Sequence, residues 1–121
     1  MANEITLNLK MQVSKGFIEY IQNPGALSVT MSGTNATGGI QNIGTTAETI
    51  TMGDVSSQGY AYFRNIGTTN YVDIGTGTGG SFVAFARLKA GEACIVRLAT
   101  AAPTARANTA AVDLQYMIFA D

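Results

Sequence analysis

Apolar and polar residues alternate strictly near the start of the chain. From residue 5 to residue 13 each odd position is apolar, and the residues between them are polar; the apolar set is Ile5, Leu7, Leu9, Met11 and Val13. Successive side chains of a β-strand point to opposite faces, so this period of two predicts a strand with one buried and one hydrated face. No segment of the chain keeps the 3.6-residue apolar period of a sizeable helix.

Further strand patterns follow along the whole sequence. A second clean alternation is formed by Val112, Leu114, Tyr116 and Ile118, and the other runs are rich in β-branched and aromatic residues. These runs cover residues 17–21, 27–31, 40–43, 48–52, 60–65, 71–74, 82–88 and 93–98. Gly, Thr, Asn or Ser separates them, and a break is expected at Asn23-Pro24-Gly25. About nine or ten short strands predict an all-β fold, an antiparallel β-sandwich.

One sandwich domain is expected over residues 1–121, since a chain of this length can bury a core without metals or disulfides. The chain has no Trp and one Cys, so the core marker of immunoglobulin domains is missing and a jelly-roll-like sandwich is favoured. Asn42-Ile43-Gly44-Thr45-Thr46 recurs as Asn65-Ile66-Gly67-Thr68-Thr69, which we interpret as two similar turns and not as a structural repeat.

Charged residues make up only 12% of the chain, about half of the usual fraction, and the net charge is −1. A surface with so few charges is consistent with a Thr-rich monomer. We favour the alternative, a protein that buries part of its surface against other subunits. The basic residues are scattered, which argues against nucleic acid as a partner. No apolar run is long enough for a membrane span, the N-terminus lacks a signal-peptide pattern, and Cys94 has no partner for a disulfide, so synthesis in a reducing cytoplasm is expected.

No catalytic or cofactor site is predicted. The stretch Gly75 to Gly80 has the G-x-G-x-x-G spacing of a dinucleotide loop, but Ser81-Phe82-Val83 continues it as a strand where a helix is required. The chain has no histidine, and Cys94 lies within an apolar strand. The carboxylates are scattered beside turns, so neither a metal site nor a glycosidase pair is indicated. We therefore expect neither an enzyme nor a cofactor.

A stretch of small residues from 99 to 111 is predicted to be a loop, either a subunit contact or simply mobile. Its candidate contact residues are Ala99, Thr100, Ala101, Ala102, Pro103, Thr104, Ala105 and Arg106. After residue 88, the segment Leu88-Lys89-Ala90-Gly91-Glu92 predicts a tight turn, and Arg87, Glu92 and Arg97 are expected to form an ion pair across it.

Residues 60–65, 70–75, 82–92 and 114–119 form a pattern of aromatic strands and tight turns in the second half of the chain. This pattern resembles that of small virion proteins of tailed bacteriophages, and the resemblance covers about half of the chain. It implies a structural component of the virion: a capsid decoration (cement) protein that forms a homo-oligomer, expected to be a trimer, and binds the major capsid protein. A tail, fibre or baseplate subunit is the alternative. A third hypothesis, of another class, is a carbohydrate-binding sandwich that uses Tyr60, Tyr62 or Tyr71.

Overall fold

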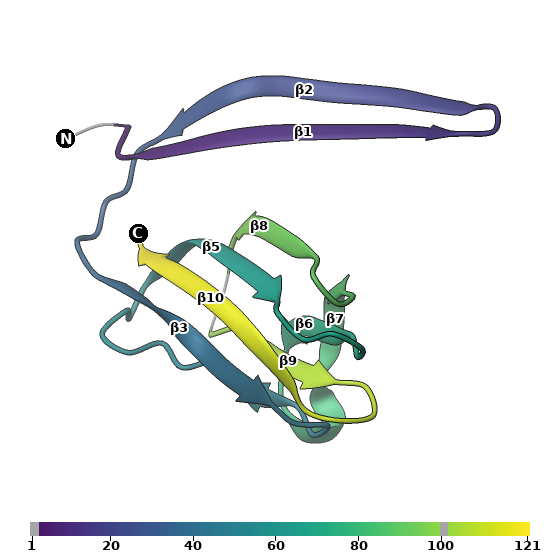
Figure 1. Cartoon of the computed structure of the whole chain (residues 1–121). Coiled ribbons are helices and arrows are strands. Elements are labelled where there is room, and N and C mark those ends of the chain that lie inside the picture. The colour runs from purple at the N-terminus through teal and green to yellow at the C-terminus, as the bar shows by residue number, and fades with distance from the viewer. Residues whose placement is uncertain (1–2, 100–101) are drawn as a thin grey trace. The chain divides into compact units, whose positions relative to one another are not determined.

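The computed structural model describes residues 3–99 and 102–121 and divides the chain into two compact units, Met1–Ser32 and Gly33–Asp121 (Figure 1). Ten strands and one short 3₁₀ turn lie within the described residues. In chain order they are β1 (Ile5–Lys15), β2 (Ile18–Val29), β3 (Ala36–Ile43), β4 (Glu48–Thr49), β5 (Gln58–Asn65), β6 (Val72–Thr76), η1 (Gly79–Ser81), β7 (Val83–Leu88), β8 (Ala93–Arg97), β9 (Thr104–Ala107) and β10 (Val112–Ala120).

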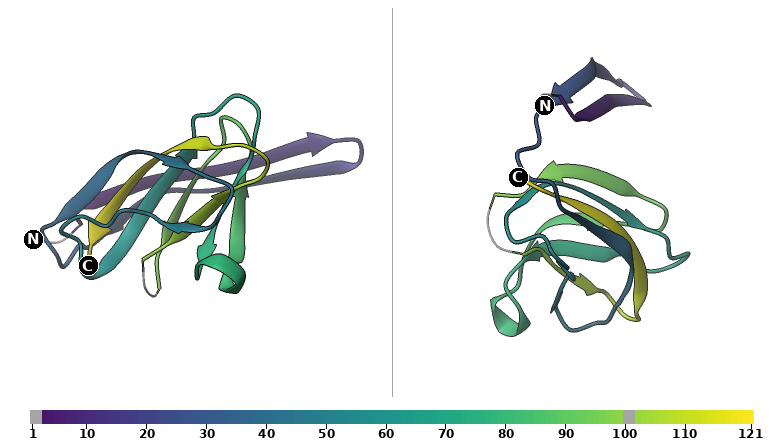
Figure 2. Two further views of the ribbon diagram at one scale, coloured as in Figure 1. Left: turned by 90° about the horizontal axis from the view of Figure 1, so that it is seen from below. Right: turned by 90° about the vertical axis from the view of Figure 1, so that its left-hand side faces the viewer.

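The second unit is an antiparallel sandwich of two four-stranded sheets, seen from two sides in Figure 2. One sheet has the order β3-β10-β5-β8 and the other β4-β9-β6-β7. Along the chain, each connection between consecutive strands passes from one sheet to the other, except the one from β6 to β7. This alternation is the jelly-roll arrangement of two interlocked Greek keys. The predicted all-β, jelly-roll-like sandwich is therefore confirmed.

The core lies between these two sheets and follows the period of two. In β10 the even positions, from Val112 to Ala120, are buried, whereas most of the odd positions are exposed. Strand β6 lies inside its sheet and is buried along nearly its whole length. The largest fully buried apolar side chains are Phe63, Ile43, Ile50, Ile74, Leu114, Ile118 and Val72. Apolar burial of this kind stabilises a sandwich without metals or disulfides.

The first unit is a hairpin, which we call the arm (β1 and β2). Its two-residue loop begins with Gly16 at φ 58°, the positive φ that the first loop position of a type II′ turn requires. The expectation of one sandwich domain over residues 1–121 differs from this division. The break expected at Asn23-Pro24-Gly25 is wrong, because β2 runs through all three residues as a bulged strand. Proline is tolerated there because both strands of a two-stranded sheet are edges.

The expectation of a loop over residues 99–111 is wrong for the middle of this segment. Residues 104–107 form β9, which pairs with β4 on one side and β6 on the other. Ala105 and Ala107 are buried in the core. The side chains are small here because the two sheets pack closely together. A run of Ala and Thr has no alternation of large apolar and polar residues, so the sequence pattern did not predict this strand.

Each copy of the Asn-Ile-Gly-Thr-Thr repeat begins at the end of a strand, but the two copies bury different side chains. In the first copy Ile43 is buried and Asn42 is exposed; in the second, Asn65 is buried and Ile66 is exposed. The Asn65 side chain donates to the carbonyls of Asn70 and Leu88 and accepts a hydrogen bond from Gly67 N–H. Asn65 therefore links the end of β5 to the following turn and to the end of β7.

Candidate assembly surfaces

One face of the arm is mostly apolar. Residues that oppose each other in an antiparallel pair share a face, and the register pairs Leu7 with Leu27 and Val13 with Tyr20. Gln22 and, at the tip, Lys15 are the polar side chains on this arm face, and its apolar side chains are Ile5, Leu7, Leu9, Met11, Val13, Ile18, Tyr20, Leu27 and Val29. The opposite face carries mostly polar residues, among them Thr6, Asn8, Lys10, Gln12, Ser14, Glu19 and Ser28.

A bulge keeps the apolar residues of β2 in phase. Leu9 opposes Gly25 and Met11 opposes Gln22, so Asn23 and Pro24 together face Lys10. The extra residue reverses the alternation once, which returns the later apolar residues of β2 to the face that Ile18 and Tyr20 occupy. The sequence showed the β1 half of this face, but the β2 half depends on the bulge and was missed.

Most of the arm face is exposed to solvent. The side chains of Leu9, Met11, Val13, Ile18, Tyr20 and Leu27 are 37% to 62% exposed, and Phe17 at the tip of the loop is fully exposed. A two-stranded hairpin alone is at best marginally stable in water, and contiguous apolar patches of this kind mark interaction sites. The arm therefore has the character of an interface element.

A second group of apolar side chains lies on the outside of the β3-β10-β5-β8 sheet. The register places Met117, Tyr62 and Ile95 in one row across three strands. Gly38 continues this row in β3, where a Cβ atom would lie 2.7 Å from Met117 Sδ, so glycine lets the Met117 side chain lie flat over the strand. In the neighbouring rows this outer sheet face carries the apolar or aromatic side chains Ile40, Tyr60 and Phe119 and also the exposed Arg64 and Arg97, so apolar and charged side chains are mixed on it.

The outside of the other sheet is charged. Asp73 of β6 lies in register between Arg87 of β7 and Arg106 of β9. Arg87 donates two hydrogen bonds to the buried Asp73 carboxylate, from Nε at 2.8 Å and from Nη2 at 3.2 Å. The bond to Asp73 raises the pKa of Arg87, whose guanidinium lies 3.9 Å from the centre of the Tyr71 ring. Asp73 and the two arginines in register with it therefore make the middle of this sheet surface polar.

The ion pair expected among Arg87, Glu92 and Arg97 is wrong. Arg87 binds Asp73, Arg97 Nη1 donates to Asp121 Oδ2 at 2.9 Å, and a Glu92 carboxylate oxygen accepts from the backbone N–H of Lys89. Strands β7 and β8 lie in different sheets, so the turn between them is not that of a hairpin and does not bring the two arginines to one face.

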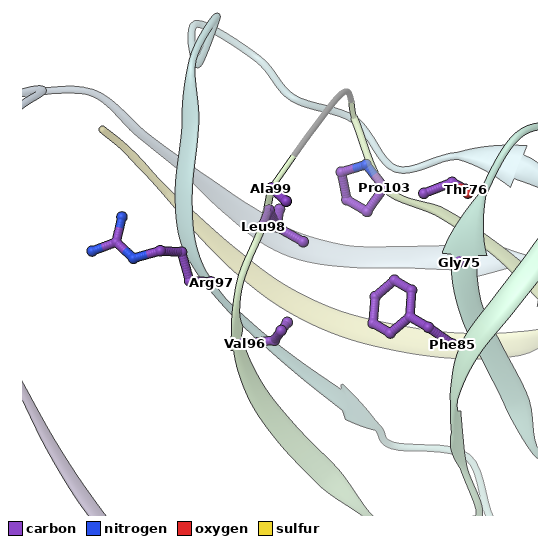
Figure 3. Close-up of a pocket in the computed structure, with 8 residues that line it drawn as sticks. All are labelled: Gly75, Thr76, Phe85, Val96, Arg97, Leu98, Ala99 and Pro103. Carbon is purple, nitrogen blue, oxygen red and sulfur yellow. The ribbon is translucent and has the colours of Figure 1, made fainter.

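The candidate contact residues lie in different surroundings. Pro103, Thr104 and Ala105 are buried in the sandwich, Thr100 and Ala101 lie outside the described residues, and Ala99 and Arg106 are exposed. Ala99 and Pro103 line a cavity of about 250 Å³ at the edge of the sandwich, together with Gly75, Thr76, Phe85, Val96, Arg97 and Leu98 (Figure 3). Most of this lining is apolar, and Arg97 points away from Phe85 and Pro103. Subunit contact stays a prediction for the exposed residues.

The tyrosines of the carbohydrate hypothesis are not gathered on one surface. Tyr60 and Tyr62 belong to the outer sheet face, whereas Tyr71 lies in the polar cluster around Asp73. Arg97 covers one face of the Tyr60 ring at 4.5 Å, as Arg87 covers Tyr71. Arginine therefore occupies ring faces on which a sugar would stack.

The glycine-rich stretch after β6 connects it to β7, as predicted, through the short turn η1. A Cβ atom on Gly75 would collide with the carbonyl oxygen of Val83, so glycine serves close strand packing here. Among residues 3–99 and 102–121, no three His, Cys, Asp or Glu side chains gather as metal ligands would. The same residues include no helix long and apolar enough to cross a membrane.

Burial raises the pKa of the Cys94 thiol, whose side chain packs against the core. The folded protein therefore holds the thiol proton more tightly than the unfolded chain does. The resulting contribution to stability is fully present below about pH 8.5, the usual thiol pKa, and is lost as the pH rises above it. We therefore expect urea unfolding between pH 7 and pH 10 to show a steeper alkaline loss of stability for the native chain than for Cys94→Ala. Parallel curves for the two proteins would contradict this.

Comparison with known proteins gave no match to a protein-family model, a curated protein sequence or a solved structure. The strand order and the exposed hairpin therefore define the class: a jelly-roll protein that carries an arm with one mostly apolar face.

Proposed function

We propose that this chain is a structural protein of a tailed-phage virion, a capsid decoration protein that oligomerises and binds the capsid lattice to stabilise it. The observation that carries the proposal is the exposed apolar arm face, from Leu9 and Met11 on β1 to Tyr20 and Leu27 on β2. A monomer gains nothing from exposing such a surface, whereas a subunit of an assembly covers it on binding.

Three further features support this function. The charged fraction of 12% leaves little repulsion between neighbouring copies. The jelly roll is an architecture that viral capsid proteins use widely. The resemblance of residues 60–65, 70–75, 82–92 and 114–119 to virion proteins of tailed phages supports a virion as the assembly. A tail, fibre or baseplate subunit would use the same surfaces and is the second candidate.

Sedimentation velocity over a concentration series tests the first part of the proposal. We expect a homo-oligomer, a trimer under the proposed function, at micromolar concentration. Immunogold labelling of intact particles, with antibodies against the purified chain, tests the second part and separates head from tail. A monomer at all concentrations, together with particles that carry no label, would rule the proposal out.

A further inference from the structure

We propose that a polar pocket on the outside of the β4-β9-β6-β7 sheet binds a small neutral ligand rich in hydroxyl groups, a sugar or another polyol. This inference goes beyond the proposed assembly function and uses residues of the sandwich alone. The pocket, which we call the Asp73 pocket, has a volume of about 290 Å³ and is lined by Thr45, Tyr71, Asp73, Arg106, Ala107 and Asn108. Small-molecule sites begin at roughly 300 Å³, so one sugar ring fits this pocket better than a chain of them.

The walls of the Asp73 pocket come from two adjacent inner strands. The register pairs Asp73 of β6 with Arg106 of β9. Where β9 ends and β6 begins, Asn108 N–H donates to the Tyr71 carbonyl at 3.3 Å. Side chains carried by paired strands hold their positions better than those on free loops, so the pocket exists before a ligand arrives.

Two hydrogen-bond acceptors of the pocket are buried. Asp73 is only 4% exposed, and Arg87 donates one hydrogen bond to each of its carboxylate oxygens, although a carboxylate can accept about four. Asn108 Oδ1 is fully buried and accepts no hydrogen bond from residues 3–99 and 102–121. A buried acceptor without a donor costs free energy, so these oxygens favour a ligand that brings O–H or N–H groups.

Hydrogen-bond donors lie beside these acceptors. Arg106 is exposed, and its guanidinium lies 4.7 Å from the centre of the Phe82 ring. Within the described part of the chain this guanidinium forms no ion pair, although Asp73 is its neighbour across the strands. Its N–H groups are therefore available to a ligand, and the exposed Thr45 hydroxyl can donate or accept.

This combination of groups selects a neutral hydroxylated ligand. A carboxylate or phosphate would meet the Asp73 carboxylate and Asn108 Oδ1, which repel it. An ammonium ligand would meet Arg106, at a carboxylate that Arg87 already neutralises. A hydroxyl both donates and accepts, so neighbouring hydroxyls of one ligand can donate to the buried oxygens and accept from Arg106. Recognition here depends on hydrogen bonds and not on ring stacking, since Arg87 covers a face of the Tyr71 ring.

Titration of the isotope-labelled full chain, followed by its amide chemical shifts, tests the site. The probes are glucose, galactose, mannose, N-acetylglucosamine and glycerol. We expect at least one of them to bind with a Kd on the order of 1–10 mM and to shift the amide signals of Tyr71, Asp73 and Asn108. If none of the probes moves these signals at about 100 mM, the inference is wrong.

Matched arginine variants locate the bound sugar. Arg106→Ala removes the proposed donor, whereas Arg64→Ala removes an exposed arginine from the outside of the other sheet. We expect Arg106→Ala to weaken binding at least about tenfold, as for the loss of a hydrogen bond from a charged donor, and Arg64→Ala to stay within about twofold. Asn108→Ala, which removes the buried acceptor, should weaken binding as well. Equal Kd values for the two arginine variants would place the sugar elsewhere and overturn the inference. The amide spectrum of each variant also shows whether the sandwich is folded.

Charged probes test the class of ligand. Sodium acetate and ammonium chloride should not shift the signals of the pocket at concentrations where a sugar does, and a stronger response to either salt would overturn the assignment of a neutral ligand. These titrations use the purified chain and do not depend on assembly. A chain that forms oligomers and labels particles but binds no probe would therefore overturn this inference and leave the proposed function standing.

Discussion

Replacing Asn65 with leucine is expected to destabilise the sandwich by about 3 kcal/mol, because three buried or half-buried partners would lose their hydrogen bonds at once. Asn65 is fully buried, with its amide nitrogen 2.8 Å from the Asn70 carbonyl oxygen and 2.9 Å from that of Leu88. Its side-chain oxygen accepts from Gly67 N–H at 2.8 Å. Leucine has the same number of side-chain heavy atoms and the same branching at Cγ but offers neither a donor nor an acceptor.

The repeat supplies a matched control for this prediction. Asn42 occupies the same position in the first copy but is exposed, and its side-chain nitrogen donates a hydrogen bond to Asp113 Oδ1 at 2.9 Å. Asn42→Leu is therefore expected to cost less than about 1 kcal/mol. Thermal unfolding should show a loss of roughly 12–24 °C for Asn65→Leu and only a few degrees for Asn42→Leu. Equal shifts for the two variants would contradict the role given to Asn65.

The sequence predicted the fold class because alternation is a local property. The pattern in Val112, Leu114, Tyr116 and Ile118 requires only that one face of a strand be buried, and β10 has that burial. The missing Trp and single Cys then favoured the jelly roll over the immunoglobulin sandwich, and the strand order agrees. Strand β9 escaped detection because its Ala and Thr side chains are small, and their burial depends on both neighbouring strands.

The candidate surfaces were harder to predict because they depend on register. Met117 and Tyr62 are far apart in sequence, and only the pairing of β10 with β5 and of β5 with β8 places them in a row with Ile95. The same holds for Asn65, whose hydrogen bond to Leu88 joins residues that no pattern connects. Local patterns report which residues are apolar, whereas the partners across strands decide which surface they form.

Exchanging Ala26 with Leu27 and Ser28 with Val29 is expected to abolish most of the self-association of the chain, because it moves Leu and Val to the polar face of the arm. In the native register Leu27 and Val29 share the apolar face, whereas Ala26 and Ser28 lie on the polar one. The exchange keeps the composition and the length of the strand but reverses the face of these four side chains. With the apolar partners of Ile5 and Leu7 lost, we expect sedimentation to show at least about 30-fold weaker association.

Deleting Asn23 separates the apolar face from the bulge itself. The deletion leaves Pro24 alone opposite Lys10, so β2 alternates regularly and Leu27 and Val29 stay on the arm face. We expect this variant to associate within about tenfold of the native chain. If the exchange associates as tightly as the native chain, the arm face is not the contact. If the deletion abolishes association while the hairpin is formed, the contact depends on the bulge itself and not on the apolar face that the bulge aligns.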